Sequence, residues 1–187
     1  MVESMSVTNK PVVSRAIAWS YGCVVSLIAV LIFFFAYASF FAPMKALGIP
    51  ASIVLAVVEV IMLLILNSLY QTRYVLTDDE LLIKTTKLIG GNKGIPLKAI
   101  KSIEETLIPF GIKLFGASFH GGYYQVPGLG RAFLAITNFK DGLLIKTRQG
   151  NYIITPKDPL DFKEAIETMI RQKQVTSIAR LEGKQAM

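Results

Sequence analysis

Two long apolar runs dominate the sequence: AIAWSYGCVVSLIAVLIFFFAYASFF (residues 16–41) and ALGIPASIVLAVVEVIMLLILNSLY (residues 46–70). The first run has 26 residues without a charged side chain, and the second has Glu59 as its only charged residue. A helix needs roughly 20 apolar residues to cross the ~30 Å hydrocarbon core of a bilayer. We therefore predict two membrane-spanning helices, at residues 16–41 and 46–70.

The connection between the two runs is only four residues long, 42–45. Within lipid, every backbone N–H and C=O group must be satisfied inside its own helix, so two spans joined this closely form an antiparallel hairpin. The alternative is a pair of helices buried in a soluble core. It is disfavoured because core helices seldom remain apolar and free of charge beyond about 18 residues.

Positive charges are distributed unevenly around this predicted hairpin. Five lysine and arginine residues lie near the outer ends of the runs and one lies in the connection: Lys10, Arg15, Arg73, Lys84 and Lys87 against Lys45. Lys and Arg close to a membrane are retained on the cytoplasmic side. We therefore expect a multi-pass protein of the cell membrane, with both termini and the soluble domain in the cytoplasm.

The chain beyond residue 70 is basic, with 17 Lys and Arg residues against 11 Asp and Glu residues, a net charge of +6. A basic domain held at a bilayer faces anionic headgroups, so we expect membrane lipids among the partners. Nucleic acid is not expected, because the charges are interspersed along predicted strands and are not clustered with aromatic residues on one surface.

Three segments make up the rest of the chain. Residues 1–15 are polar and lack periodicity, so we expect a mobile cytoplasmic segment without regular structure. Residues 173–187 are polar and basic, and we expect a flexible tail. Between the hairpin and this tail, residues 71–172 have the length of one domain.

Strand-like runs separated by turn residues fill most of this domain and predict a bent antiparallel sheet of about seven strands. A helix follows, because Asp158 suits the N-cap and Pro159 suits the first helical position. Apolar residues then recur with helical spacing at Phe162, Ala165, Ile166, Met169 and Ile170. We predict an α+β domain whose sheet is closed by this C-terminal helix.

A series of short motifs in this domain resembles the prokaryotic pleckstrin-homology-like (PH-like) domain family, the bacterial PH domains, from Tyr74 to about Arg171. The motifs are LTDD (76–79), LIKT (82–85), IPL (95–97), GYY (122–124), LGR (129–131), TN (137–138) and IITP (153–156). The resemblance implies a PH-like fold behind a transmembrane hairpin. It also implies a membrane-attached module that is not an enzyme.

The turn after the first predicted strand departs from PH domains that bind phosphoinositides. Those domains carry Lys and Arg around this loop, where charge-assisted hydrogen bonds hold phosphates. Here the turn is Asp78, Asp79 and Glu80. Three carboxylates would repel a phosphate, so we expect no phosphoinositide binding at the usual PH site.

Residues suited to catalysis are scarce. The domain has one histidine, His120, and the only cysteine, Cys23, lies in the first apolar run. No catalytic motif surrounds a serine, and no metal ligands occur at useful spacing. We expect no enzymatic activity, no metal and no cofactor. His120 could act as a general base, but a histidine at the surface or at a strand end is the favoured interpretation.

The best candidate for a binding site is the glycine-rich and aromatic stretch of residues 116–131. Arg131 could present its planar guanidinium to a carboxylate or phosphate, with Tyr123 and Tyr124 beside it and His120 in the same stretch. The alternative is a bulged hairpin with a purely structural role. In that case Arg131 would pair with Glu104 or Glu105.

Glu59 is an intramembrane polar residue near the middle of the second predicted span. An ionisable group at that depth is costly, so it suggests a function such as an oligomer contact or a proton-linked switch. The alternative is a protonated Glu59 hydrogen-bonded to a hydroxyl group of the first span, from Ser26, Tyr37 or Ser39.

Our leading hypothesis for function is a membrane-anchored binding or scaffolding module. It would recruit a protein partner, or form a homo-oligomer, through exposed strand edges or the groove beside the last helix. A second hypothesis is a small transport or sensing subunit in which the hairpin and Glu59 are the working part. An enzyme is the least favoured class.

Overall fold

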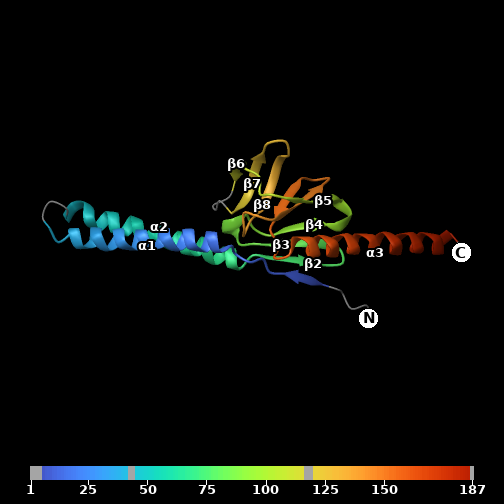
Figure 1. Ribbon diagram of the computed structural model, residues 1–187, viewed down its shortest axis with the longest axis horizontal. Helices are drawn as coiled ribbons and strands as arrows, with labels where there is room; N and C mark the ends of the chain where they lie inside the picture. Colours follow the sequence, from blue (N-terminus) through green and yellow to red (C-terminus); the bar gives the residue numbers. More distant parts are fainter. Residues whose placement is uncertain (1–5, 42–44, 116–119, 186–187) are drawn as a thin grey trace. The chain divides into compact units, whose positions relative to one another are not determined.

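The computed structural model describes residues 6–41, 45–115 and 120–185. The chain forms two compact units, one of residues 13–71 and one of the remaining described residues. Figure 1 shows the first as a pair of helices and the second as strands followed by one helix.

The helical unit consists of α1 (Arg15–Ala38) and α2 (Lys45–Tyr70). Ser14 caps α1, because its Oγ accepts a hydrogen bond of 3.2 Å from the Ile17 amide. The helix ends at Ala38, three residues before the predicted end. There the amides of Phe40 and Phe41 donate to the carbonyls of Tyr37 and Ala38 in a turn.

Both helices are long and apolar enough to span a membrane, as predicted. Only 11% and 6% of their most apolar windows are buried within the protein. A core helix of a soluble protein would bury most of that surface, so the low burial disfavours the soluble-core alternative. The chain therefore carries two helices suited to membrane association, while their sidedness stays a prediction.

The two helices pack closely at Gly48 of α2. A β-carbon added there would lie 2.6 Å from the carbonyl oxygen of Phe35 in α1 and 2.8 Å from the Cβ of Ser39, the residue that follows α1. These separations are shorter than van der Waals contact, so the observed packing requires a residue without a side chain. Small residues have this role at helix interfaces in membranes.

The second unit contains two sheets among the described residues. The first sheet has the order β1-β2-β3-β4: β1 (Val7–Asn9), β2 (Arg73–Leu76), β3 (Glu80–Lys84) and β4 (Lys93–Pro96). The second has the order β5-β9-β10-β8-β7-β6: β5 (Ile100–Thr106), β6 (Ile112–Phe115), β7 (Gly121–Val126), β8 (Gly130–Ala135), β9 (Gly142–Thr147) and β10 (Asn151–Ile154). Two 3₁₀ turns flank β4, at Lys87–Ile89 and Leu97–Ala99.

The predicted combination of sheet and C-terminal helix is confirmed, but the details of the sheet differ from the prediction. Ten strands in two sheets replace about seven in one, counted over the described residues. One pair is parallel. Strand β10 lies between β9 and β8, and it runs antiparallel to β9 but parallel to β8, with Asn151 opposite Ala132. Such pairings depend on contacts distant in sequence.

The N-terminal segment, expected to lack regular structure, contributes strand β1. Val7 lies opposite Leu76 of β2, and the Asn9 side chain accepts a hydrogen bond of 3.0 Å from the Lys157 amide. A three-residue strand has no detectable periodicity. Its partner is far along the chain, so its formation could not be predicted from local sequence.

Helix α3 (Pro159–Gln185) begins at the predicted proline and lays its apolar face on the sheets. Its Phe162, Ile166 and Met169 are buried in the main core, with residues of both sheets such as Leu81 and Ile145. The helix continues past Gln172 to Gln185, where we expected a flexible tail. Lys, Gln, Ala, Arg, Leu and Glu predominate there, and all favour helix.

Tyr74 connects the core elements through a buried hydroxyl group. It donates to the Ala135 carbonyl at 2.8 Å and accepts from the Thr155 amide at 3.2 Å. Burial raises the pKa of Tyr74 to about 12, against the effect of the hydrogen bonds from Thr155. This side chain therefore remains neutral at physiological pH.

Candidate binding surfaces

The β7–β8 hairpin brings Arg131 and Tyr123 together, and the sequence had suggested that these two side chains could lie side by side. The Arg131 Cζ lies 4.4 Å from the centroid of the Tyr123 ring and 6.0 Å from that of Phe115. Lys93 of β4 places its Nζ 5.2 Å from the same Tyr123 ring and 5.4 Å from Phe133. We call these five residues the cation–aromatic cluster. Whether the cluster binds a ligand stays a prediction.

The ion pair expected between Arg131 and Glu104 or Glu105 is not present. Glu104 pairs with Lys146 at 2.7 Å, and Glu105 pairs with Lys163 at 3.5 Å. Strands β10 and β9 lie between β8 and β5 in the sheet, so Arg131 is too far away for either contact. Hydrogen bonds from Lys146 and Ser102 lower the pKa of Glu104.

Tyr124 does not join the cluster, because successive residues of a strand point to opposite faces of the sheet. It belongs to a second apolar core with Val126, Leu134 and Ile153. The Lys113 ammonium lies 5.8 Å from the centroid of the Tyr124 ring. Burial raises the pKa of Tyr124 and lowers the pKa of Lys113.

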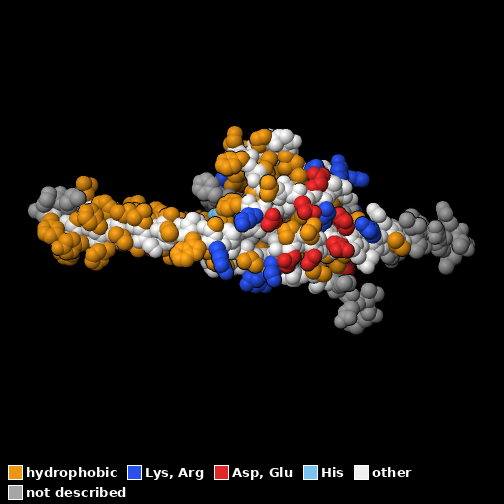
Figure 2. All heavy atoms as spheres, in the orientation of Figure 1, with side chains coloured by type: hydrophobic (Ala, Val, Ile, Leu, Met, Phe, Trp, Pro, Cys, Tyr) orange, Lys and Arg blue, Asp and Glu red, His pale blue; other side chains and the backbone are white. Residues whose placement is uncertain are grey.

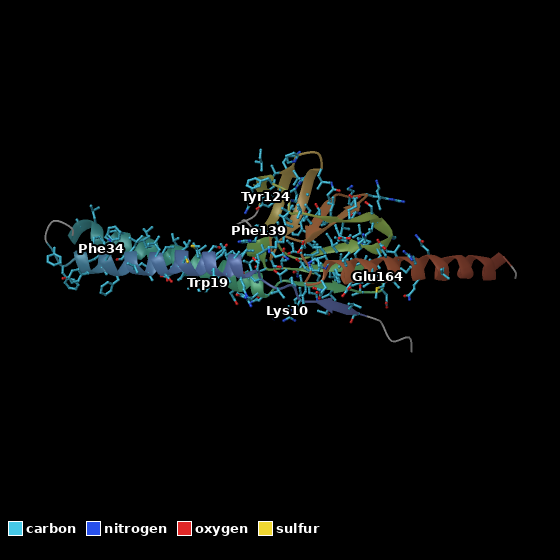
Figure 3. All side chains as sticks on the ribbon, in the orientation of Figure 1. Lys10, Trp19, Phe34, Tyr124, Phe139 and Glu164 are labelled. Carbon is cyan, nitrogen blue, oxygen red and sulfur yellow. The ribbon has the colours of Figure 1, made fainter. Side chains whose placement is uncertain are left out.

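His120 lies immediately before β7, the strand-end position that we expected, but it is buried and not at the surface. It is 5% exposed, and its ring lies 5.7 Å from that of Phe139. Phe139, labelled in Figure 3, follows β8 in the sequence. Burial, with a smaller effect of the Lys113 charge, lowers the pKa of His120 to about 4. The imidazole is neutral at pH 7 and closed to solvent. This placement does not suit a general base acting on a substrate.

Residues 110–115 form an exposed surface that sequence reasoning missed. Phe110, Ile112, Leu114 and Phe115 are 98%, 75%, 41% and 66% exposed, and we call these four the apolar edge. The segment contains β6, which is an edge strand of the six-stranded sheet. Figure 2 shows hydrophobic side chains gathered over β6 to β8. A shallow cavity of about 610 Å³ lies beside it, lined by Phe110, Gly111, Ile112, residues 125–128 and Gly130.

The apolar edge was missed because Pro109 and Gly111 indicated only a break between strands. An apolar run such as IKLF usually predicts a buried strand. The sequence signal that could have identified an exposed strand is Lys113, a charged residue that interrupts this apolar run. In the structure Lys113 itself is half-buried, and its apolar neighbours are exposed.

The start of α3 and the end of β5 form a groove of about 470 Å³. Its lining combines exposed leucines with two acidic residues: Glu105, Thr106, Leu107, Asp141, Gly142, Pro159 and Leu160. We call it the acidic groove. Strand β5 is the other edge of the six-stranded sheet, so the groove lies beside a sheet edge and the last helix, the two places predicted for a partner.

The turn between β2 and β3 keeps its acidic character in the structure. Asp78 and Asp79 are exposed, and Asp79 forms an ion pair with Lys173 of α3. The hydrogen bond and charge of Lys173 lower the pKa of Asp79. Asp79 is therefore negatively charged at neutral pH.

Glu59 is half-buried in α2. Over the described residues, the structure contains no hydrogen bond or ion pair to its carboxyl group. The Ser39 hydroxyl, one of the predicted partners, donates instead to the Ala36 carbonyl at 2.6 Å. The functional role of Glu59 stays a prediction.

The structure offers no evidence of a metal centre: in the part of the chain that it describes, no three His, Cys, Asp or Glu residues group closely enough to hold an ion.

Comparison with known proteins agrees with this architecture. The family model described as "Bacterial PH domain" matches residues 72–170, which include all strands from β2 to β10 and the packed part of α3. No curated protein and no solved structure matches the chain. The matched region covers more than half of the sequence, so the chain belongs to the bacterial PH domain family.

Proposed function

We propose that this protein is a membrane-anchored binding module that recruits a protein partner. The two apolar helices supply the anchor, and the PH-like domain supplies the binding surface. Residues 71 and 72 alone separate α2 from β2, so the domain remains within a short chain length of the bilayer. Two observations support a non-catalytic role. His120 is buried and neutral, and PH-like domains are generally binding modules that lack catalytic activity.

The acidic groove is the observation that carries this proposal. Its exposed leucines, Leu107 and Leu160, offer apolar contact. Asp141 places a carboxylate at the rim, together with Glu105, which pairs with Lys163. Among the described strands, β5 pairs on one side only, with β9, so its outer edge can accept an added strand. The partner that fits is a protein segment with apolar side chains flanked by Lys or Arg.

Other ligand classes fit the domain less well. A phosphoinositide at the usual PH site would meet Asp78 and Asp79. A nucleic acid would need a continuous basic surface, yet several cations of the domain pair with carboxylates: Lys146 with Glu104, Lys163 with Glu105, and Lys173 with Asp79.

Affinity capture of the full-length protein from its native membrane, in mild detergent, tests the proposal. The informative variant is Asp141→Lys, which reverses one charge at the rim of the acidic groove. Asp78→Lys is the matched control, because it makes the same change at an exposed aspartate in the β2–β3 turn. We expect Asp141→Lys to lose the partner and Asp78→Lys to retain it. Equal capture by both variants would reject the groove as the binding site.

A second candidate function, a small transport or sensing subunit, rests on Glu59. The carboxyl group lies within an apolar helix and is reached by no hydrogen bond or ion pair from the described residues. An ionisable group without such compensation is costly in the hydrocarbon region of a membrane. Replacement by glutamine tests this candidate. Loss of assembly or of proton-linked activity in Glu59→Gln would favour it. If the substitution changes neither, the hairpin serves only as an anchor.

A further inference from the structure

The apolar edge exposes large side chains that the fold leaves uncovered. In β6 the lysine is half-buried whereas Ile112, Leu114 and Phe115 face outward, which reverses the usual pattern of a solvated strand. Phe110, in the turn before β6, is almost completely exposed. Soluble surfaces rarely keep contiguous apolar patches of this kind unless another surface covers them.

The segment that contains the apolar edge and the next two strands of the sheet, β7 and β8, carries charges of one sign. From Thr106 to Lys140 the sequence contains no Asp or Glu, and the cations in this stretch are Lys113, Arg131 and Lys140. Arg131 is exposed and lies over Tyr123 and Phe115, so its charge is presented beside the apolar edge. The occupant that complements this surface is anionic and can accept apolar side chains.

A second copy of the chain does not meet this requirement. In a two-fold symmetric contact the same patch faces itself. The cations of one copy would then lie against those of the other, with no carboxylate from residues 106–140 to compensate. An anionic bilayer does meet the requirement, because headgroup phosphates accept bidentate hydrogen bonds from arginine and the acyl boundary accepts Phe and Leu.

The membrane is also the surface nearest along the chain. Two residues join α2 to β2, so the domain experiences a high effective concentration of lipid once the hairpin is inserted. We infer that the apolar edge enters the headgroup region of an anionic bilayer, with Lys113 and Arg131 contacting lipid phosphates. This inference depends on the helical anchor and is independent of the acidic groove.

Fluorescence quenching in nanodiscs tests this inference on the full-length protein. A Cys23→Ser background removes the native thiol, and an environment-sensitive fluorophore is attached at Phe110→Cys. Leu160→Cys is the matched control, because Leu160 is an exposed apolar residue of the acidic groove. The nanodiscs contain phosphatidylcholine alone or mixed with phosphatidylglycerol, with a doxyl-labelled lipid as quencher.

We expect the probe at residue 110 to be quenched several-fold more strongly than the probe at residue 160 in the anionic nanodiscs. Quenching should fall several-fold in phosphatidylcholine alone and in the Lys113→Gln/Arg131→Gln variant, whose folding is checked by its thermal unfolding. Equal quenching of the two probes would overturn the inference. Quenching that does not depend on lipid charge would also overturn it. So would a probe at residue 110 that is shielded from solvent in detergent, because a protein or a second copy would then cover the apolar edge.

Discussion

Single residues of the domain place polar groups inside the apolar core, and their hydrogen bonds and protonation states determine its stability. Tyr74 is the clearest case, because its hydroxyl group satisfies both the Ala135 carbonyl and the Thr155 amide. Tyr74→Phe would leave both backbone groups buried without this partner. We expect a loss of about 1–3 kcal/mol in the free energy of unfolding.

Denaturant unfolding of the full-length protein in detergent, followed by near-UV circular dichroism, measures this loss. Tyr123→Phe is the control, because Tyr123 is half-buried and contributes mainly its ring to the cation–aromatic cluster. A Tyr74→Phe variant as stable as the control would contradict the role given to the buried hydroxyl group.

His120 predicts a dependence of stability on pH. Its pKa is about 4 in the folded protein and about 6.5 in an unfolded chain, so the unfolded state binds more protons between these values. The stabilisation is therefore complete above about pH 6.5 and is lost as the pH falls toward 4. The upper limit of the loss is about 3 kcal/mol.

The free energy of unfolding at pH 7 and pH 4.5, compared between wild type and His120→Gln, checks this prediction. We expect wild type to lose much more stability than the variant across this interval, since glutamine does not titrate. The same loss in both proteins would assign the acid sensitivity to the carboxylates.

At the scale of elements, the hairpin depends on the close approach of α1 and α2 at Gly48. Gly48→Val would place a side chain against the Phe35 carbonyl and Ser39, forcing the helices apart. We expect the helix pair to lose about 1–3 kcal/mol of packing free energy. Gly22→Val is the matched control, because a β-carbon at Gly22 meets no atom within 4 Å.

Distance measurements between spin labels on α1 and α2, in bilayers, give the readout for this pair of variants. The distance distribution should broaden or lengthen in Gly48→Val and remain unchanged in Gly22→Val. An unchanged distribution in both would show that the close approach at Gly48 is not needed for the hairpin.

The elements that sequence could predict are those determined by local pattern. The apolar runs predicted α1 and α2, and Asp158 with Pro159 predicted the start of α3. Strand β1 and the parallel pairing of β10 with β8 could not be predicted, because each pairs residues far apart in sequence.

The candidate site was predictable to a similar degree. Tyr123 and Arg131 lie on the two strands of one hairpin, so their proximity could be predicted from their spacing in the sequence. The contribution of Lys93 from β4, the burial of His120 and the exposure of Phe110 all required the packed structure.

At the scale of the whole molecule, two chemically different surfaces occur on one anchored domain. The acidic groove presents leucines with Glu105 and Asp141, and the apolar edge lies among cations. Figure 2 shows acidic and basic side chains interspersed over the region of β3 to β5 and hydrophobic ones over β6 to β8. Opposite charge suits different occupants, so one surface can contact lipid while the other holds a protein.

The most direct test of partner recruitment is photo-crosslinking in the native membrane. A photoreactive residue is incorporated at Leu160, within the acidic groove, or at Val175, an equally exposed apolar residue of α3 outside its lining. We predict that Leu160 yields a discrete cross-linked protein, identified by mass spectrometry, that is absent for Val175 and is lost in Asp141→Lys. The same products from both positions, or only lipid adducts from Leu160, would contradict the account.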